Sequence, residues 1–359
     1  MYINPTFLAV DAAFIIEKLV LIVAVVTGSL LIAMYCTWGE RKVAGWIQDR
    51  RGPNRAGPLG LFQPLADGLK LFFKEEIIPT HANKFLFVLG PVLAMLTAIM
   101  VGAVIPWGNK IDFFGREVSM QIADINIGIL YVFGVVGLGV YGIMIGGWAS
   151  NNKYSLLGAM RAASQIISYE LAMGISIIAL LMITGTLSLN HMVDQQIDKV
   201  WYVFYQPLGF LIFLICAFAE TNRTPFDLPE AENELIGGYH AEYSSMKLGF
   251  YLFSEYINMF LSSAVMATLY FGGYDIPFVN DAKLVESIGL NWTALLQLVV
   301  LFGKILGFIF LFMWVRWTIP RFRYDQLMNL GWKVLLPLAL INMFVTGAII
   351  LIKQNGWPF

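Results

Sequence analysis

Long apolar stretches separated by shorter polar segments dominate this chain. Eight of these stretches have about the 20 residues that an α-helix needs to cross a bilayer. They are residues 14–35, 85–105, 127–148, 164–183, 203–219, 247–271, 294–317 and 334–352. A helix satisfies its own backbone hydrogen bonds inside lipid, so the pattern predicts an all-α polytopic membrane helix bundle. We expect about eight transmembrane helices in a single membrane domain over residues 1–359.

The basic residues predict which side of the membrane each connecting segment faces. Together with their flanking residues, the loops 36–84, 149–163, 219–246 and 318–333 hold sixteen lysines and arginines, and the opposite loops hold five. Loops rich in Lys and Arg stay on the cytoplasmic side of a membrane. These four segments are therefore predicted to be inner loops, and the even number of spans places both termini outside.

The first inner loop is the longest and changes character along its length. It opens with GERKVAGWIQDRRGPNRAGPLG, whose glycines, prolines and arginines predict an irregular backbone. The following LFQPLADGLKLFFKEEIIP has apolar residues at helical spacing beside a polar stripe that includes Asp67 and Lys70. This predicts an amphipathic helix lying in the membrane interface. Its polar stripe is either solvated or the wall of a functional cavity.

The apolar stretch at 127–148 is rich in glycine. Gly142 and Gly146 are four residues apart, a spacing of small residues that lets helix backbones approach closely. We interpret this spacing as tight packing within the bundle.

Residues 219–246 form an acidic segment between two apolar spans. The segment reads FAETNRTPFDLPEAENELIGGYHAEYSS and combines six carboxylates with one arginine, Arg223. The carboxylates are Glu220, Asp227, Glu230, Glu232, Glu234 and Glu242. Charges beside a bilayer are costly unless they are hydrated, paired or used, so this concentration predicts the handling of protons or cations. The alternative is a solvated loop, which interleaved apolar residues such as Phe226 disfavour.

Pro229 predicts local order within the acidic segment. Asp227 lies two residues earlier and suits a helix N-cap, with Pro229 near the first helical position. Glu230 and Glu234 would then lie one turn apart on the same face. Adjacent carboxylates share protons, so such a group titrates as a cluster, and Arg223 is placed to offset part of its charge.

Two further carboxylates lie inside predicted spans. Glu170 is in SQIISYELAMGI, and Glu255 is in FYLFSEYINMF. An ionisable residue within a span indicates a functional site by default, because its burial is expensive. Both are candidates for a proton relay, and the alternative for each is a structural hydrogen bond to a neighbouring helix. Lys304, also within a span, is the candidate counterion.

Composition narrows the chemistry further. Charged residues make up 13% of the chain and the net charge is −1, so no basic field favours a nucleic-acid partner. The three histidines and two cysteines have no ligand spacing, which predicts no metal site and no cofactor bound by this chain alone. The sequence has no Walker loop and no dinucleotide-binding fingerprint in a strand–helix context.

Several of these segments together resemble the membrane subunit of respiratory complex I that joins the proton pump to the redox arm (the H subunit of NADH:quinone oxidoreductase in bacteria, subunit 1 in mitochondria). The matching stretches are GERKVAGWIQDRRGPN, GLFQPLADGLKLFFKE, ISYE, FAETNRTPFDLPEAENELIGGYHAEY and WVRWTIPRFRYDQLM. They cover both main inner loops and the last one, and the eight-span layout agrees.

The resemblance implies a function and roles for individual residues. It implies that flavin and iron–sulfur clusters on partner subunits carry electrons from NADH to quinone, the substrate, and that quinone enters from the bilayer through this subunit. The residues implied for the quinone channel are Arg41, Arg50, Asp67, Lys70, Phe226 and Asp227. Those implied for proton coupling are Glu170, Glu220, Arg223, Glu230, Glu232, Glu242 and Glu255.

The resemblance also implies partners and a location. The partners would be the hydrophilic subunits of the quinone site, small membrane subunits, antiporter-like subunits and membrane lipid, in a bacterial inner membrane rather than an organellar one. The chain would have no activity in isolation. Two alternatives stay open: the homologous subunit of a quinone-independent ion-pumping hydrogenase or ferredoxin-linked complex, and a free-standing ion transporter. The polar stripe and basic stretch of the first inner loop favour the quinone version, and the large docking face argues against a free-standing transporter.

Overall fold

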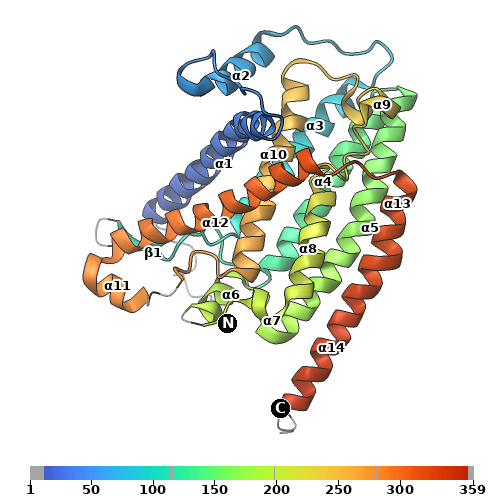
Figure 1. The fold of residues 1–359 in the computed structure, drawn as a ribbon. Helices are drawn as coiled ribbons and strands as arrows, with labels where there is room; N and C mark the ends of the chain where they lie inside the picture. Colours follow the sequence, from blue (N-terminus) through green and yellow to red (C-terminus); the bar gives the residue numbers. More distant parts are fainter. Residues whose placement is uncertain (1–11, 114–115, 198, 278, 280, 355–359) are drawn as a thin grey trace, which may run out of the picture.

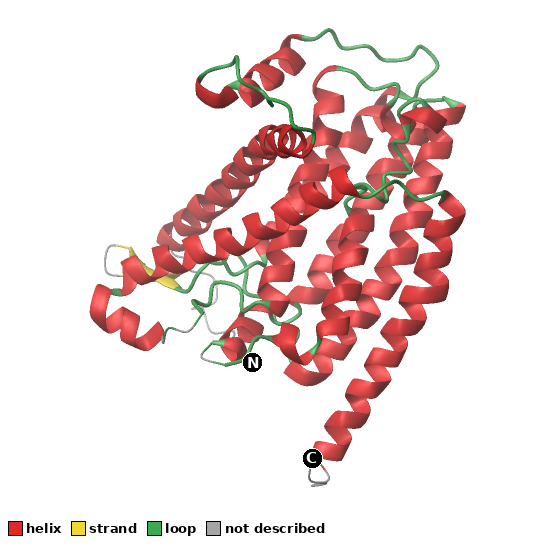
Figure 2. Ribbon diagram, viewed as in Figure 1, coloured by secondary structure: helices red, strands yellow, loops and turns green. Residues whose placement is uncertain are grey.

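The computed structural model describes residues 12–113, 116–197, 199–277, 279 and 281–354, and most of them are helical (Figure 2). The helices are α1 (Ala12–Ile47), α2 (Gln63–Phe73), α3 (Lys84–Met100), α4 (Gly128–Ala149), α5 (Lys153–Thr184), α6 (Leu189–Gln196), α7 (Tyr202–Tyr205), α8 (Pro207–Glu220), α9 (Glu232–Leu235), α10 (Ser245–Tyr270), α11 (Asp281–Ile288), α12 (Leu290–Thr318), α13 (Tyr324–Asn329) and α14 (Leu336–Gln354), with a π-helical turn at Leu330–Leu335. The described strands β1 (Lys110–Phe113) and β2 (Arg116–Ser119) form one small antiparallel hairpin. The all-α class is therefore confirmed, with this hairpin as a minor addition.

Seven of the described helices are long and apolar enough to cross a membrane. They are α1, α3, α4, α5, α10, α12 and the continuous stretch from α13 to α14. The eighth predicted span, 203–219, corresponds to α8, which has 14 residues. Such a helix rises roughly 21 Å, less than the hydrocarbon core of about 30 Å. The polytopic bundle is thus built from seven long helices and a shorter one.

The two ends of the bundle carry different elements (Figure 1). One end carries α2 and α9, and the opposite end carries α6, α7 and the end of α14. We call them the inner end and the outer end, after the sidedness that the basic residues predict. The loop 221–244, which contains α9, therefore belongs to the inner end together with the loop around α2.

The predicted inner loops are more helical than the sequence indicated. α1 continues to Ile47, so the first loop begins at residue 48 instead of 36, and α5 already begins at Lys153. The last loop is helical from Tyr324 onward. Gly45 lies within α1 and is a point of close contact. A Cβ at this position would lie 2.8 Å from the carbonyl oxygen of Arg50, so the following loop can approach the helix only where there is no side chain. The Arg50 backbone N–H also donates to the Gly45 oxygen at 2.9 Å and ends the helix.

The predicted amphipathic helix is confirmed as α2. It lies beside the inner ends of α1 and α10, and the Ser245 hydroxyl donates to the Leu71 carbonyl oxygen at 3.1 Å. Leu69 and Phe72 on its apolar side are 58% and 67% exposed, which suits a helix whose apolar face rests on lipid.

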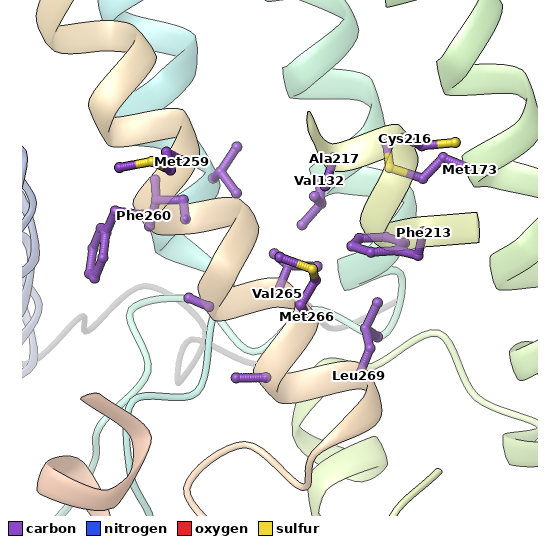
Figure 3. Packing of buried hydrophobic residues seen from close by; sticks show 14 of the residues in the cluster. Val132, Met173, Phe213, Cys216, Ala217, Met259, Phe260, Val265, Met266 and Leu269 are labelled. Carbon is purple, nitrogen blue, oxygen red and sulfur yellow. The ribbon is translucent and has the colours of Figure 1, made fainter. Parts of the chain in front are cut away.

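An apolar core runs through the bundle, and Figure 3 shows part of it. Val132 of α4, Met173 of α5, Phe213 of α8 and Val265 of α10 point toward one another there and are buried. In lipid, where the apolar solvent gives no hydrophobic driving force, close packing of this kind holds helices together.

Helices α3 and α4 approach each other at glycine, as the spacing of Gly142 and Gly146 predicts. A Cβ on Gly142 would lie 2.8 Å from the Ala94 backbone nitrogen and 2.9 Å from the Gly90 carbonyl oxygen. The backbones of the two helices are therefore in contact at this point, and only glycine fits.

Candidate functional site

The acidic loop 221–244 folds back against the bundle and does not extend into solvent. Gln165 of α5 holds it in place: its side-chain amide donates to the carbonyl oxygens of Ala219 at 2.8 Å and of Phe226 at 2.9 Å. Phe226 is 3% exposed, and its ring contacts the rings of Tyr169 and Phe322. The interleaved apolar residues thus anchor the segment, as the sequence indicated.

Arg223 lies at the centre of a group of buried charges. Its Nη1 is 3.4 Å from Glu40 Oε2 of α1, and its Nη2 is 3.9 Å from Glu255 Oε2 of α10. The guanidinium carbon lies 4.1 Å from the ring centroid of Tyr256, a cation–π distance. Burial disfavours the charged guanidinium, but Tyr256, Glu40 and Glu255 outweigh it, so the pKa of Arg223 is raised above its usual value. Arg223 therefore stays charged.

Glu40 is bound from three directions. Its Oε1 lies 2.6 Å from Nη1 of Arg316 at the inner end of α12. Its Oε2 accepts a hydrogen bond from the Tyr256 hydroxyl at 2.7 Å and also faces Arg223. Since the residue is only 7% exposed, these partners replace water and fix the carboxylate between α1, α10 and α12.

Tyr239 joins two carboxyl groups. Its hydroxyl oxygen lies 3.0 Å from Glu230 Oε1 and 2.8 Å from Glu255 Oε1. His240 Nδ1 is 3.4 Å from the same Glu230 oxygen. Burial acts to raise the pKa of Glu230, but hydrogen bonds from Glu255, His240 and Tyr239 outweigh it and lower this pKa below its usual value. A hydrogen bond between two carboxyl groups needs a proton, so Glu230 and Glu255 share one.

We call this group the Arg223 cluster; its members are Glu40, Arg223, Glu230, Tyr239, Glu255, Tyr256 and Arg316. Two arginines face three carboxylates, so the cluster lacks one positive charge when all three are ionised. A proton on the Glu230–Glu255 pair, or on His240 beside Glu230, supplies that charge. The cluster can therefore hold and release a proton inside the bundle.

Two small cavities extend from the cluster and meet at Glu220. The first has a volume of about 40 Å³ and is lined by Tyr239, Glu255 and Glu220. The second, of about 30 Å³, is also lined by Glu220 and ends against Phe213 and Val265 of the apolar core. A water needs about 10–15 Å³, so each cavity has room for on the order of two or three waters. A polar route thus runs from the cluster to Glu220 and ends at apolar residues of the core.

Glu170 lies on α5 close to Glu220, near enough for their charges to interact. Its Oε1 is 3.1 Å from the position that a Cβ would occupy on Gly137 of α4. The missing side chain of Gly137 therefore makes room for this carboxyl group. Of the predicted coupling residues, Arg223, Glu230, Glu255 and Glu220 are brought together by the structure, with Glu170 beside them.

The other two predicted coupling residues lie apart from the cluster or are not fully described. The Glu242 carboxylate accepts a hydrogen bond from the Asn152 side chain at 2.6 Å, at the start of α5. Glu232 begins the short helix α9, and its side chain lies outside what the structure describes.

The predicted quinone-channel residues fall into separate groups. Arg41 of α1 bonds to Asp67 of α2, with Nη1 and Oδ2 2.7 Å apart, and Lys70 lies one turn further along α2. Arg50 donates instead to the Gln48 side chain at 2.7 Å. The Arg41–Asp67 pair therefore fastens the amphipathic helix to the first long helix.

Phe226 and Asp227 form the remaining group, and Asp227 does not cap a helix as predicted. Its Oδ2 lies 2.7 Å from Nη2 of Arg321, whereas the next helix begins only at Glu232. Glu234 does not share a helix face with Glu230 either, because Glu230 precedes α9. Glu234 pairs instead with Arg161 of α5 at 2.5 Å. Tertiary ion pairs with arginines have overridden the local helix signal here.

Lys304 is not the counterion of the buried glutamates. Its Nζ donates to the carbonyl oxygens of Phe271, Gly273 and Asp275 at 2.7–2.8 Å, where α10 ends. Carbonyl groups at the end of a helix lack partners within the helix. Lys304 donates to three such oxygens in the residues that directly follow α10. Arg223 takes the counterion role.

Sequence reasoning missed Glu40, Tyr239 and Tyr256. The sequence around Glu40 predicts an irregular loop. It gives no reason to expect that Glu40 is buried inside a helix. Reading GERKVAGW as a continuation of the first span exposes an ionisable residue within a helix, the same signal that identifies Glu170 and Glu255. No sequence signal distinguishes the two tyrosines from the thirteen others in the chain.

Asp227 provides a pH-dependent prediction. Burial and the nearby Glu230 raise its pKa from 3.8 to about 6, against the opposing effect of Arg321 and Arg316. The folded state then binds more protons than the unfolded state between these values, so the stability from this group is present below about pH 4 and is lost as pH rises through 6. The thermal midpoint of the assembled complex should be measured for Asp227→Asn and for the wild type. The difference, variant minus wild type, should increase from pH 4 to pH 7. A difference that stays constant over this range would contradict the assignment.

A helical membrane bundle that encloses ionisable residues near one end defines the class: a polytopic membrane protein with an internal cluster of buried, paired charges. The family model described as NADH dehydrogenase matches residues 19–347. The chain therefore belongs to the NADH dehydrogenase family, and the resemblance inferred from its motifs is confirmed.

Individual relatives agree over nearly the whole chain. A Flavobacterium psychrophilum protein, named as the H subunit of an NADH-quinone oxidoreductase, is 66% identical over 95% of this chain and 99% of its own length. A Cytophaga hutchinsonii protein, also named as an H subunit of NADH-quinone oxidoreductase, is 64% identical over 96% of this chain and 99% of its own. A Flavobacterium johnsoniae relative with the same name is 64% identical over 95% and 97%.

Proposed function

We propose that this chain is the membrane subunit of a proton-pumping NADH:quinone oxidoreductase, where it admits quinone from the bilayer and couples quinone reduction to proton translocation. The names of its relatives support the complex and the substrate. The Arg223 cluster supports the coupling role, because its two arginines face three carboxylates and it connects through a cavity to Glu220. Reduction of a quinone to a quinol consumes two electrons and two protons, and a cluster that releases or takes up a proton responds to that demand.

The quinone channel would begin at α2. A quinone has an apolar tail and a polar head, so it needs an apolar surface open to lipid that leads to polar groups. The helix offers exposed Leu69 and Phe72 on one side and the Arg41–Asp67 pair on the other. Charged residues of the first inner loop would then guide the head group toward the hydrophilic partners.

Electron carriers and partners follow from the same proposal. Flavin and iron–sulfur clusters would lie on hydrophilic partner subunits, with small membrane subunits and antiporter-like subunits along the bilayer. The location would be a bacterial inner membrane, with the inner end facing the cytoplasm. The alternatives, a quinone-independent hydrogenase-type complex and a free-standing ion transporter, are disfavoured by relatives that are named as subunits of a quinone-linked oxidoreductase.

Replacing Glu230 with glutamine tests the coupling role. The amide keeps the shape of the side chain but cannot share a proton with Glu255, so quinone reductase activity and proton pumping should fall together by about a hundredfold, the usual scale for the loss of a positioned proton donor or acceptor. Assembly on native gels should be unchanged. Glu234→Gln is the matched control, because that carboxylate is half-exposed and pairs with Arg161 outside the cluster. Normal pumping and turnover in Glu230→Gln would refute the role.

Photo-crosslinking with a short-tailed azidoquinone in native membranes tests the channel. Label should map to residues 41–75 or 220–242 and be competed away by excess quinone. An unlabelled chain in a complex that still reduces quinone would leave this subunit as a coupling element without a channel. A complex with no quinone reductase activity would favour the hydrogenase-type alternative.

A further inference from the structure

A groove at the outer end of the bundle lies between α5, α7 and α14. Its volume is about 550 Å³, within the range of pockets that hold small molecules. The described residues that line it include Lys199 and Lys353 but no carboxylate. Asp198, the sequence neighbour of Lys199, lies outside the described residues. The described walls of the groove therefore carry two positive charges and attract an anion.

The polar groups on the floor of the groove already satisfy one another. The Gln206 side-chain amide donates to the Thr346 hydroxyl at 2.7 Å, and Asn342 donates to the Gln206 Oε1 at 2.9 Å. Gln206 and Thr346 are each 5% exposed, so this network serves to hold α8 against α14. Within the described part of the chain, the two lysine side chains have no such bond and stay available to a ligand.

The lining changes from charged to apolar along α14. Lys353 is at the rim, Ile349 and Ile350 lie about one turn deeper, and Thr346 lies roughly 10 Å below the lysine along the helix. The interfacial layer on each side of the hydrocarbon core is about 5–8 Å thick. Lys353 therefore lies at headgroup depth when the isoleucines lie at the level of the first acyl carbons. Tyr205, 60% exposed at the rim, is typical of the same interfacial layer.

We propose that this groove binds an anionic phospholipid of the outer leaflet. The phosphate would lie between Lys199 and Lys353, with the Tyr205 hydroxyl as a further donor, and an acyl chain would follow Ile349 and Ile350. A lipid fits better than an acidic protein segment, because a lipid has a charged headgroup followed by an apolar chain. The groove has the same order, with a charged rim followed by an apolar wall. The bound lipid would fasten the last helix to α5 and α7 at the outer end.

Photoactivatable lipids test this site in the assembled complex. Phosphatidylglycerol and phosphatidylcholine, each with a diazirine in the acyl chain, are added to the purified complex below saturation, and labelled peptides are mapped. Phosphatidylglycerol should label residues 183–206 and 346–353 in preference to phosphatidylcholine. In Lys199→Gln/Lys353→Gln this label should fall on the order of tenfold, because each lysine near anionic headgroups favours them several-fold. Lys110→Gln, which removes an outer lysine paired with Glu117, should keep the label.

Several results would overturn the proposal. Equal labelling by the two lipids in the wild type would do so without any variant, as would undiminished label in the double variant. Loss of the label with excess inorganic phosphate would show a site for a free anion. Absence of label from both lipids would show that the groove is closed to lipid, as it would be if a protein partner occupied it. Lys199→Arg/Lys353→Arg, which keeps both charges, should restore the label and so separates loss of charge from misfolding.

Discussion

Arg223→Gln is expected to prevent stable assembly of the complex and to abolish quinone reductase activity. The substitution leaves Glu40, Glu230 and Glu255 buried with one arginine, and removing a partner from a buried ion pair costs about 3–5 kcal/mol. Native gels of solubilised membranes would report assembly, and NADH:quinone turnover would report activity. Arg223→Lys should recover little, because a lysine presents a point charge and not a planar fork that faces two carboxylates.

A double variant separates electrostatics from chemistry. Arg223→Gln/Glu255→Gln removes one basic and one acidic group, so the remaining groups can again balance in charge. Assembly should recover towards the wild-type level while activity stays lost. Arg323→Gln is the matched control, since Arg323 is exposed and forms an ion pair with the exposed Asp325; an exposed pair of this kind contributes about 0–1 kcal/mol. Normal assembly and normal turnover in Arg223→Gln would contradict the assignment of the cluster.

Gly142→Val is expected to disrupt the bundle at the contact between α3 and α4. Even its Cβ would lie 2.8 Å from the Ala94 nitrogen and 2.9 Å from the Gly90 carbonyl oxygen, and both neighbours are backbone atoms that cannot rotate away. Overpacking of a close-packed core costs about 1–3 kcal/mol and more where backbone must move. The amount of assembled complex and its thermal midpoint should both fall.

Gly134→Val is the matched control for this prediction. Gly134 lies on the same helix, two turns away, and nothing lies within 4 Å of the position of its Cβ. Any intrinsic effect of valine on the helix is shared by the two variants, so the difference between them isolates the contact. Equal behaviour of the two variants would show that α3 and α4 do not touch at Gly142.

The long helices and the close packing at Gly142 could be predicted from the chain alone, although one of the eight predicted spans is the shorter helix α8. A membrane span is a local property, because each helix satisfies its own backbone and needs only enough consecutive apolar residues. The amphipathic character of α2 is equally local and follows from residue spacing. Glu170 and Glu255 can be recognised for a similar reason, since the cost of a buried charge can be inferred from its apolar neighbours.

The identity of the charge partners was decided only by the tertiary structure. Arg223 could have been matched with any nearby carboxylate of its own loop, and Lys304 with either buried glutamate. In the folded chain Arg223 faces Glu40, which lies 183 residues away, while Lys304 binds the carbonyl oxygens after α10. Asp227 is likewise bound by Arg321 and does not cap a helix. An ion pair between distant segments depends on which helices lie next to each other in the bundle. The hydropathy pattern locates the helices but does not say which of them are neighbours.

Helix length and residue spacing thus follow from interactions within about one turn, so the sequence is sufficient for the bundle and for the glycine contact. The Arg223 cluster, its Tyr239 bridge and the cavities that meet at Glu220 combine side chains from α1, α8, α10, α12 and the acidic loop. Such a site exists only when these segments pack together, because its stability depends on burial and on partners that arrive from different helices.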